Sequence, residues 1–141
     1  MNKFIKYILY IWQLLQNIIG LIFIWVTKPE HCITLENGNK VYFSSKMNGG
    51  ISLGMYSIID IYYWKSFGGN VDKIKNQNVV KHEGIGHGTQ SKWLGPLYLI
   101  IIGLPSLIWA WLYGWIIPYT TNGYYKFYTE KWADKIAGIK R

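Results

Sequence analysis

Two long apolar stretches dominate the pattern of hydrophobic and polar residues along the chain. The first covers residues 4–26 and carries no charge from Tyr7 to Val26. At 1.5 Å per helical residue it would measure about 30 Å, enough to cross the hydrocarbon core of a bilayer. The pattern therefore predicts an N-terminal transmembrane helix over 4–26, interrupted on one face by the amides Gln13, Gln16 and Asn17. A cleavable signal peptide is the alternative, but the stretch lacks a small-residue cleavage site and is long for such a signal.

The second apolar stretch covers residues 93–117 and is also free of charge. As one transmembrane span it would place its two ends on opposite sides of the membrane. Residues 103–106 (GLPS) favour a hydrophobic helical hairpin instead, because proline and serine begin a helix better than they continue one. Lys92 and Lys126 flank the stretch, as expected if both ends face one compartment, and the positive-inside tendency makes that compartment cytoplasmic.

Between these stretches, residues 31–64 are rich in β-branched and aromatic residues. Residues 37–39 (NGN) and 48–50 (NGG) are typical hairpin and turn sequences. The pattern predicts a small antiparallel β-sheet of three strands over 31–64. Such a sheet would either cover one side of the domain or offer an edge strand that pairs with an extended peptide.

Two more polar helices complete the predicted architecture. Residues 71–92 begin with a possible cap at Asp72, and residues 124–137 are followed by Gly138, a plausible helix stop. The fold class predicted for the single domain 1–141 is therefore an α+β integral membrane protein. Its expected parts are an N-terminal transmembrane helix, a small antiparallel β-sheet, a metal-site helix, a hydrophobic helical hairpin and a C-terminal helix.

Composition supports a membrane environment in this prediction. Half of the 141 residues are apolar, and the chain has eight Trp and twelve Tyr, which suit a bilayer and its interfaces. The net charge of +8 is spread over scattered lysines without a long basic run, so anionic lipid is the expected partner and nucleic acid is not. We expect an integral membrane protein of a bacterial inner membrane with its site on the cytoplasmic side. A lone Cys32 excludes an internal disulfide framework.

The candidate chemistry lies at His82, Glu83 and His87, which form the pattern H-E-x-x-x-H. Two imidazoles and a carboxylate on one helix can bind zinc and act on a water molecule. On an ideal helix, however, His82 and His87 point about 140° apart. A π-bulge absorbs one extra residue and would bring them together, and the glycines at 84, 86 and 88 make such a distortion easier.

Zinc in such a site needs a third protein ligand. Glu130 is the candidate, and Asp134 lies one helical turn further on the same face. Asp134 would accept the remaining N–H of a ligand histidine and fix its tautomer. Glu83 would act as the general base. A donor to the substrate carbonyl would come from one of three tyrosines, at 124, 125 and 128.

These motifs resemble those of the gluzincin metallopeptidases. His82-Glu83…His87 with Glu130-Lys131-Trp132-Ala133-Asp134 is similar to the CAAX prenyl endopeptidase and heat-shock membrane protease branch, whose second motif reads E-x-x-A-D. The five-residue histidine spacing is similar instead to the dipeptidyl-peptidase III family. Residues 90–98 (QSKWLGPLY) also resemble small uncharacterised bacterial membrane proteins in which H-E-x-G-H precedes Q-S and L-G-P-L-Y. The resemblance covers residues 80–137 and implies Zn²⁺ bound by His82, His87 and Glu130, with Glu83 as the base.

The sequence therefore predicts a zinc-dependent metalloprotease that hydrolyses peptide bonds at the membrane surface. Its expected partners are membrane lipid and a peptide or protein substrate. The alternative is a non-catalytic membrane protein, descended from such an enzyme or unrelated to it, that binds a partner through its aromatic interface. A membrane-active toxin is disfavoured because the central polar region has no place in one.

Overall fold

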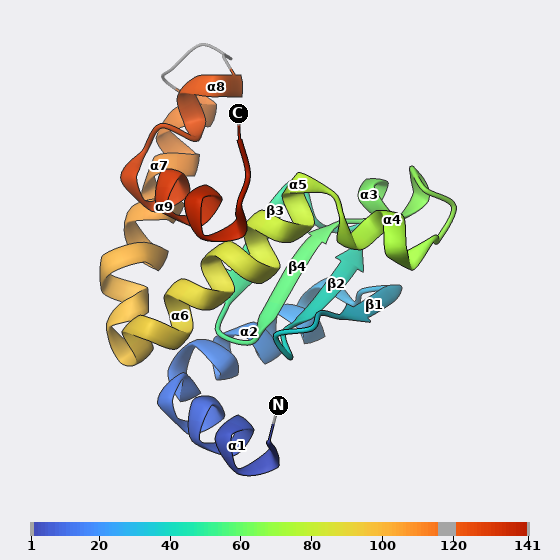
Figure 1. Cartoon of the computed structure of the whole chain (residues 1–141). Helices are drawn as coiled ribbons and strands as arrows, with labels where there is room; N and C mark the ends of the chain where they lie inside the picture. The colour runs from blue at the N-terminus through green and yellow to red at the C-terminus, as the bar shows by residue number, and fades with distance from the viewer. Residues whose placement is uncertain (1, 116–120, 141) are drawn as a thin grey trace.

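A mixed four-stranded sheet lies at the centre of the computed structural model, which describes residues 2–115 and 121–140. The strands are β1 (His31–Thr34), β2 (Lys40–Ser44), β3 (Gly50–Leu53) and β4 (Tyr56–Asp60), in the order β1-β2-β4-β3. Strands β1 and β2, and β3 and β4, pair antiparallel, whereas β2 and β4 pair parallel. One helix layer covers each face of this sheet (Figure 1).

The prediction of three antiparallel strands over 31–64 is wrong. Gly54, with φ +68°, and Met55 form a tight turn that divides the expected third strand into β3 and β4. The chain enters this hairpin so that β4 lies beside β2, which leaves β3 at the edge of the sheet. The end of the predicted sheet region forms a short helix, α3 (Tyr62–Lys65), instead of continuing as a strand.

The N-terminal transmembrane helix predicted over 4–26 is also wrong. The stretch forms α1 (Lys3–Trp12) and α2 (Leu14–Thr27), which are bent by 87° at Gln13. The bend follows from the three amide side chains of this stretch, because Gln13, Gln16 and Asn17 are all fully buried against the rest of the protein. The Gln13 side-chain carbonyl accepts from the Ser91 hydroxyl (2.6 Å), and the Asn17 side-chain carbonyl accepts from the backbone N–H of Met55 (2.8 Å).

The described residues contain no single helix that is long and apolar enough to cross a membrane, which contradicts the predicted integral membrane fold. Two bent pairs reach the required length and hydropathy only together. One is α1 with α2. The other joins the helical run Asn78–Leu97 to Leu99–Tyr113 at an angle of 118°.

The predicted metal-site helix over 71–92 is divided. A short helix α4 (Val71–Lys75), capped by Asn70 instead of Asp72, ends before α5 (Asn78–Lys81) begins. The chain then continues through a π-helical turn, η1 (His82–His87), into α6 (Gly88–Leu94).

The turn of the predicted hairpin over 93–117 falls earlier than expected. A 3₁₀ turn, η2 (Gly95–Leu97), reverses the chain, and η3 (Leu99–Gly103) runs on into α7 (Leu104–Trp115), with Pro105 in its first turn. Residues 116 and 117 of the predicted hairpin lie outside the described residues. The C-terminal region forms α8 (Thr121–Tyr124) and α9 (Tyr128–Ala137), so the helix predicted over 124–137 begins four residues later than expected. Gly138 ends α9 with φ +71°, as predicted.

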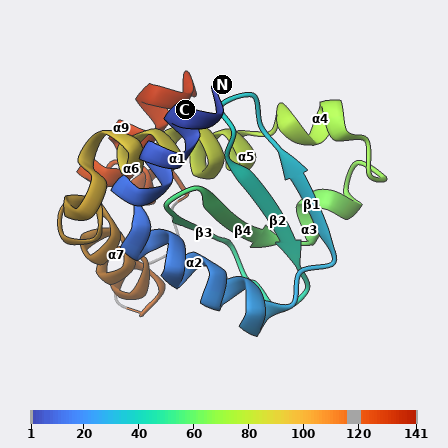
Figure 2. The same cartoon turned by 90° about the horizontal axis from the view of Figure 1, so that it is seen from below.

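The main core lies between the sheet and the helices α4 and α5 that lead into η1. It joins Val41, Phe43 and Ile59 of the sheet to Ile74 of α4 and Val80 of α5, and all five are fully buried. Helix α2 covers the opposite face of the sheet, where it packs on β3 and β4 (Figure 2). Helix α9 returns to lie along η1, so the end of the chain meets the His-Glu motif. The fold thus brings together two segments that are more than forty residues apart.

Candidate metal centre

The helix that carries the histidines changes its period at the motif itself. Residues His82–His87 form a π-helical turn between α5 and α6. Because a π-turn bonds residue i to residue i+5, His82 and His87 lie one turn apart and face the same side. Their ring centroids are 4.7 Å apart with an interplanar angle of 86°. The distortion that the unusual spacing required is therefore present.

Two asparagines from the β1–β2 turn hold the π-turn in place. The Gly84 carbonyl accepts hydrogen bonds from the side-chain amides of Asn37 (3.1 Å) and Asn39 (2.9 Å). Gly88 makes room for this contact, because a Cβ there would lie 2.0 Å from the Asn39 amide nitrogen. The hairpin sequence at 37–39 thus helps to shape the site as well as the sheet.

A second glycine lets α9 approach the site. A Cβ at Gly86 would lie 2.5 Å from the backbone oxygen of Ala133 and 2.9 Å from its carbonyl carbon. Only a residue without a side chain permits this distance. The close packing brings Glu130, one turn before Ala133, and Asp134, the residue after it, against the two histidines.

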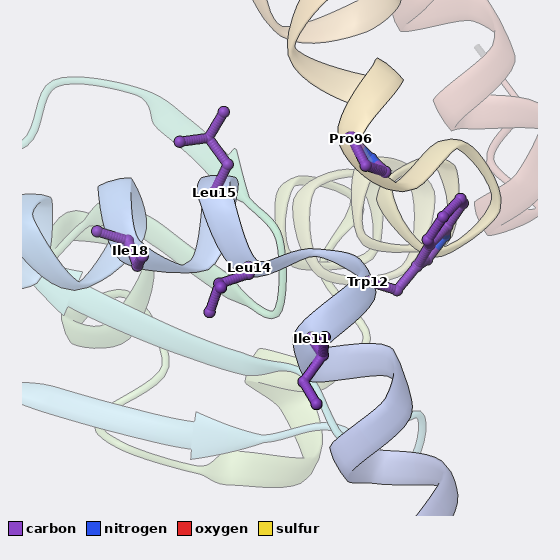
Figure 3. Close-up of a pocket in the computed structure, with 6 residues that line it drawn as sticks. All are labelled: Ile11, Trp12, Leu14, Leu15, Ile18 and Pro96. Carbon is purple, nitrogen blue, oxygen red and sulfur yellow. The ribbon is translucent and has the colours of Figure 1, made fainter.

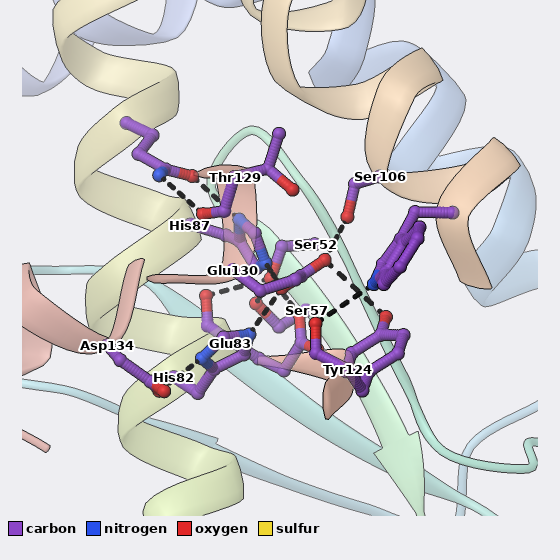
Figure 4. A network of polar contacts seen from close by, with 12 residues as sticks. Ser52, Ser57, His82, Glu83, His87, Ser106, Tyr124, Thr129, Glu130 and Asp134 are labelled. Atoms are coloured by element: carbon purple, nitrogen blue, oxygen red, sulfur yellow. Dashed lines mark hydrogen bonds and ion pairs between the residues drawn. The ribbon is translucent and has the colours of Figure 1, made fainter. Parts of the chain in front are cut away.

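His82, His87 and Glu130 form one buried cluster (Figure 4). Glu130 Oε2 lies 2.8 Å from His82 Nε2 and 2.9 Å from His87 Nε2. One ligand atom from each residue can be chosen so that all three lie within 4.8 Å of one another. Each of the three side chains is at least nine-tenths buried. The cluster could hold a metal ion.

The far nitrogen of each imidazole has its own acceptor. Asp134 Oδ1 lies 2.8 Å from His82 Nδ1, and Gln90 Oε1 lies 2.7 Å from His87 Nδ1. The Gln90 amide nitrogen donates to the Thr129 carbonyl at 3.0 Å, which keeps the Gln90 oxygen turned toward His87. In their neutral form both rings would therefore be held as Nδ1–H tautomers, with the Nε2 lone pairs directed at the cluster centre.

This arrangement calls for a cation. Asp134 and the ionised Glu130 can only accept hydrogen bonds, and a neutral imidazole has a single N–H to donate. His82 therefore turns a lone pair toward Glu130 unless a second proton or a metal ion lies between them. The same holds for His87, between Gln90 and Glu130. Two imidazoles and a carboxylate, each buried and each already oriented, fit a divalent metal such as zinc.

In the metal-free protein, protons can supply the positive charge that the cluster favours, and the pKa values of His87 and Glu130 are shifted accordingly. Burial lowers the pKa of His87, but the hydrogen bond to Glu130 and the nearby carboxylates outweigh it and raise that pKa to about 9. Burial raises the pKa of Glu130, but its contacts with His82 and His87 hold it well below the usual value. The site thus favours an ionised Glu130 facing positive charge.

Glu83 lies beside the cluster and contacts the edge strand. Its carboxylate accepts from the Ser52 hydroxyl at 2.8 Å, and the same hydroxyl lies 2.7 Å from the Glu83 backbone oxygen. Ser57 Oγ is 2.8 Å from Ser52 Oγ and extends this network on β4. Gly50 leaves space for the carboxylate, since a Cβ there would meet Glu83 Oε1 at 3.0 Å. Ser52 therefore holds the Glu83 carboxylate, and neither residue belongs to the His82, His87 and Glu130 cluster.

The predicted tyrosines separate into different roles. The Tyr124 hydroxyl lies 3.4 Å from Glu130 Oε1, an oxygen that also accepts from Ser106 of α7. The Tyr125 ring packs edge-on against His82 with centroids 5.3 Å apart. Tyr128 donates to the Ile101 carbonyl at 2.7 Å and so has a structural partner. The Tyr124 hydroxyl therefore reaches the cluster through Glu130.

The sequence interpretation missed several residues of the site. Gln90 belongs to the Q-S run, and its position three residues after His87, which places it on the same helix face, is a signal for its role. Ser52 and Ser106 come from distant segments and carry no local signal. The roles of Asn37 and Asn39 were hidden because hairpin turns use the same residues.

Comparison of the chain with protein-family models, with curated proteins and with solved structures gives no match.

Proposed function

We propose that the protein is a zinc-dependent peptidase of gluzincin type. The observation that supports this most directly is the convergence of His82, His87 and Glu130 from two segments of the chain, with Glu83 next to them. A pair of histidines with a glutamate is a ligand set that zinc hydrolases use, and it leaves a coordination position for a reacting molecule. The resemblance of both motifs to the gluzincins points the same way.

The ligands are prepared for a metal before it binds. Asp134 and Gln90 fix the two imidazole rings, while Ser106 fixes the second oxygen of Glu130. When bound by these residues, zinc would supply Lewis acidity toward a water molecule and a peptide carbonyl. The protein contributes orientation and a site from which bulk water is largely excluded.

Glu83 carries the proton in the proposed reaction. The water oxygen bonds to the peptide carbon, and Glu83 accepts the water proton at its carboxylate. When the C–N bond breaks, Glu83 delivers that proton to the departing nitrogen. Ser52 orients the carboxylate through its hydrogen bond, and the Tyr124 hydroxyl, which lies 3.4 Å from Glu130 Oε1, would serve as a donor to the carbonyl oxygen of the substrate.

The position of β3 favours an extended peptide as the substrate. This strand is at the edge of the sheet, and its Ser52 touches Glu83. A peptide that pairs with an edge strand is held in extended form with its carbonyls accessible. Tyr98 donates to the Ser52 carbonyl at 3.1 Å, so pairing would use the other backbone groups of β3 or displace Tyr98.

The test compares Glu83→Gln with Glu36→Gln, the same change at an exposed glutamate. Metal content and cleavage of a quenched-fluorescence peptide library are measured on both variants and on the wild type. We expect all three to bind zinc and only Glu83→Gln to lose cleavage, by a factor of about 10²–10⁴. A zinc-loaded wild type that cleaves no peptide in the library would contradict the peptidase and favour a non-catalytic protein.

A further inference from the structure

The outer face of α2 is apolar over its whole length. Its inward face is buried against β3, β4 and α6, whereas its outward side chains are exposed among the described residues. Trp25, for example, is 77% exposed. The exposed large apolar residues of α2 are Leu14, Leu15, Ile18, Leu21, Ile22, Phe23, Trp25 and Val26. A surface helix of a water-soluble domain normally places polar residues on such a face.

A similar stripe runs along the second bent pair. From Leu97 through η3 and α7, exposed apolar residues recur every three or four positions, and Ile100 is 68% exposed. The members of this stripe are Leu97, Ile100, Leu104, Leu107, Ile108 and Trp111. We call the two stripes together the apolar surface.

The two stripes meet at the bend between α1 and α2. An apolar groove of about 280 Å³ lies there, lined by Ile11, Trp12, Leu14, Leu15, Ile18 and Pro96 (Figure 3). Hydrogen bonds fix the junction, since Trp12 Nε1 donates to the Lys92 carbonyl (3.0 Å) and Gln16 donates to the Gly95 carbonyl (2.7 Å). Pro96 brings the start of the second stripe against the first. The apolar surface is thus continuous across elements eighty residues apart.

Helix α1 adds positive charge beside this surface. By helical periodicity, Lys3 and Lys6 lie on one side of α1, and Phe4, Ile8 and Ile11 lie on roughly the opposite side. These three apolar side chains are at least half exposed. Residues 2–29 and 84–129 contain no acidic side chain. A basic amphipathic helix of this kind suits the plane of a membrane interface with anionic lipids.

We propose that the apolar surface docks onto a bilayer that contains anionic lipid, with α1 in the interface plane and α2 and α7 inserted into one leaflet. The lysines of α1 match the lipid phosphates, and the exposed side chains named above for α2 and α7 are apolar apart from the indole N–H groups of Trp25 and Trp111. The exposed tryptophans, Trp25 and Trp111, suit the head-group boundary. The proposal depends only on this surface and is independent of the metal centre.

Fluorescence from single labelled sites tests the proposal. Cys32 is the chain's lone cysteine, so Cys32→Ser gives a background for Ile22→Cys, Ile108→Cys and, as control, Tyr62→Cys. Tyr62 is 65% exposed on α3, away from α2 and α7 (Figure 1). Each site carries an environment-sensitive dye, and vesicles of equimolar phosphatidylcholine and phosphatidylglycerol are added to the full-length protein. We expect a blue shift at positions 22 and 108, and no shift at 62.

Vesicle flotation measures how much each part of the apolar surface contributes to membrane binding. Ile22→Ser combined with Ile108→Ser should weaken vesicle binding roughly tenfold or more, whereas Tyr62→Ser should not. Lys3→Gln with Lys6→Gln should weaken it about fivefold per lysine and reduce its dependence on salt. Circular dichroism establishes that the variants are folded, and His87→Ala should bind vesicles like the wild type.

Two results would overturn the proposal. One is a folded wild type that does not float with these vesicles. The other is a blue shift at positions 22 and 108 that is present without vesicles, together with a dimer mass in sedimentation, which would assign the apolar surface to a second copy of the chain.

Discussion

Replacing Gly86 with alanine tests how the site is assembled. The substitution adds one methyl group on the side of η1 that faces α9. The new Cβ would lie 2.5 Å from the Ala133 oxygen, whereas ordinary van der Waals contact begins near 3.4 Å. The obstacle is backbone, so the two helices must separate by about 0.9 Å, the difference between these two distances.

That separation has two measurable consequences. Metal–ligand distances tolerate shifts of about 0.2 Å, so moving Glu130 by several times that amount should weaken zinc binding by about ten- to a hundredfold. Overpacking costs about 1–3 kcal/mol, offset by about 1 kcal/mol because alanine favours a helix over glycine. We therefore expect a net loss of up to about 2 kcal/mol in the free energy of unfolding of the metal-free protein.

Gly103→Ala is the matched control, because its Cβ would lie 3.4 Å from Leu99 Cδ2 and 3.7 Å from the Tyr98 backbone oxygen, both ordinary contact distances. Zinc affinity is measured by competition with a chromophoric chelator, and stability by urea unfolding with metal removed. The control should bind zinc like the wild type and unfold at the same or higher urea concentration. A Gly86→Ala protein with wild-type zinc affinity would refute the argument that α9 brings the third ligand through this contact.

Three further predictions follow from the site. Because the pKa of His87 is raised to about 9 by Glu130, the stability from this pair in the metal-free protein is fully present below pH 6.5 and is lost as pH rises through 9. The urea midpoint with a chelator present should fall over that range, and His87→Gln should abolish the fall. Asn39→Ala should lower the free energy of unfolding by about 1–3 kcal/mol, since Asn39 is buried and its amide satisfies the π-turn, and an unchanged urea midpoint would contradict this. Ser52→Ala should reduce kcat about tenfold with KM and zinc content unchanged, because it frees Glu83 to rotate. A loss of zinc in Ser52→Ala would show instead that Ser52 supports the ligands.

The parts of the site that the sequence anticipated share a local cause. The spacing of His82 and His87 demands a distorted helix, and the glycines between them permit one, so the π-turn could be inferred before it was seen. Glu130 and Asp134 stand four residues apart on one helix, which limits where their carboxylates point. Chemistry that depends on neighbouring residues is accessible from sequence.

The errors arose where distant segments decide the structure. Apolar length suggested one helix over 4–26, but Gln13 bends it because Ser91, seventy-eight residues later, provides the partner for its side chain. The parallel pairing of β2 with β4 depends on the path between hairpins, which strand propensity does not encode. In both cases the sequence pattern indicated the type of secondary structure, helix or strand. Contacts between distant residues then determined where the helix bends and which strands pair.

Zinc stoichiometry tests the central claim most directly. The protein is purified, dialysed against trace zinc, and analysed by mass spectrometry for metal per chain, alongside Glu130→Ala and the exposed control Glu36→Gln. The account predicts one zinc per chain in the wild type and in the control, and none in Glu130→Ala. A wild type without bound metal, or a Glu130→Ala protein that retains it, would contradict the proposed metal centre.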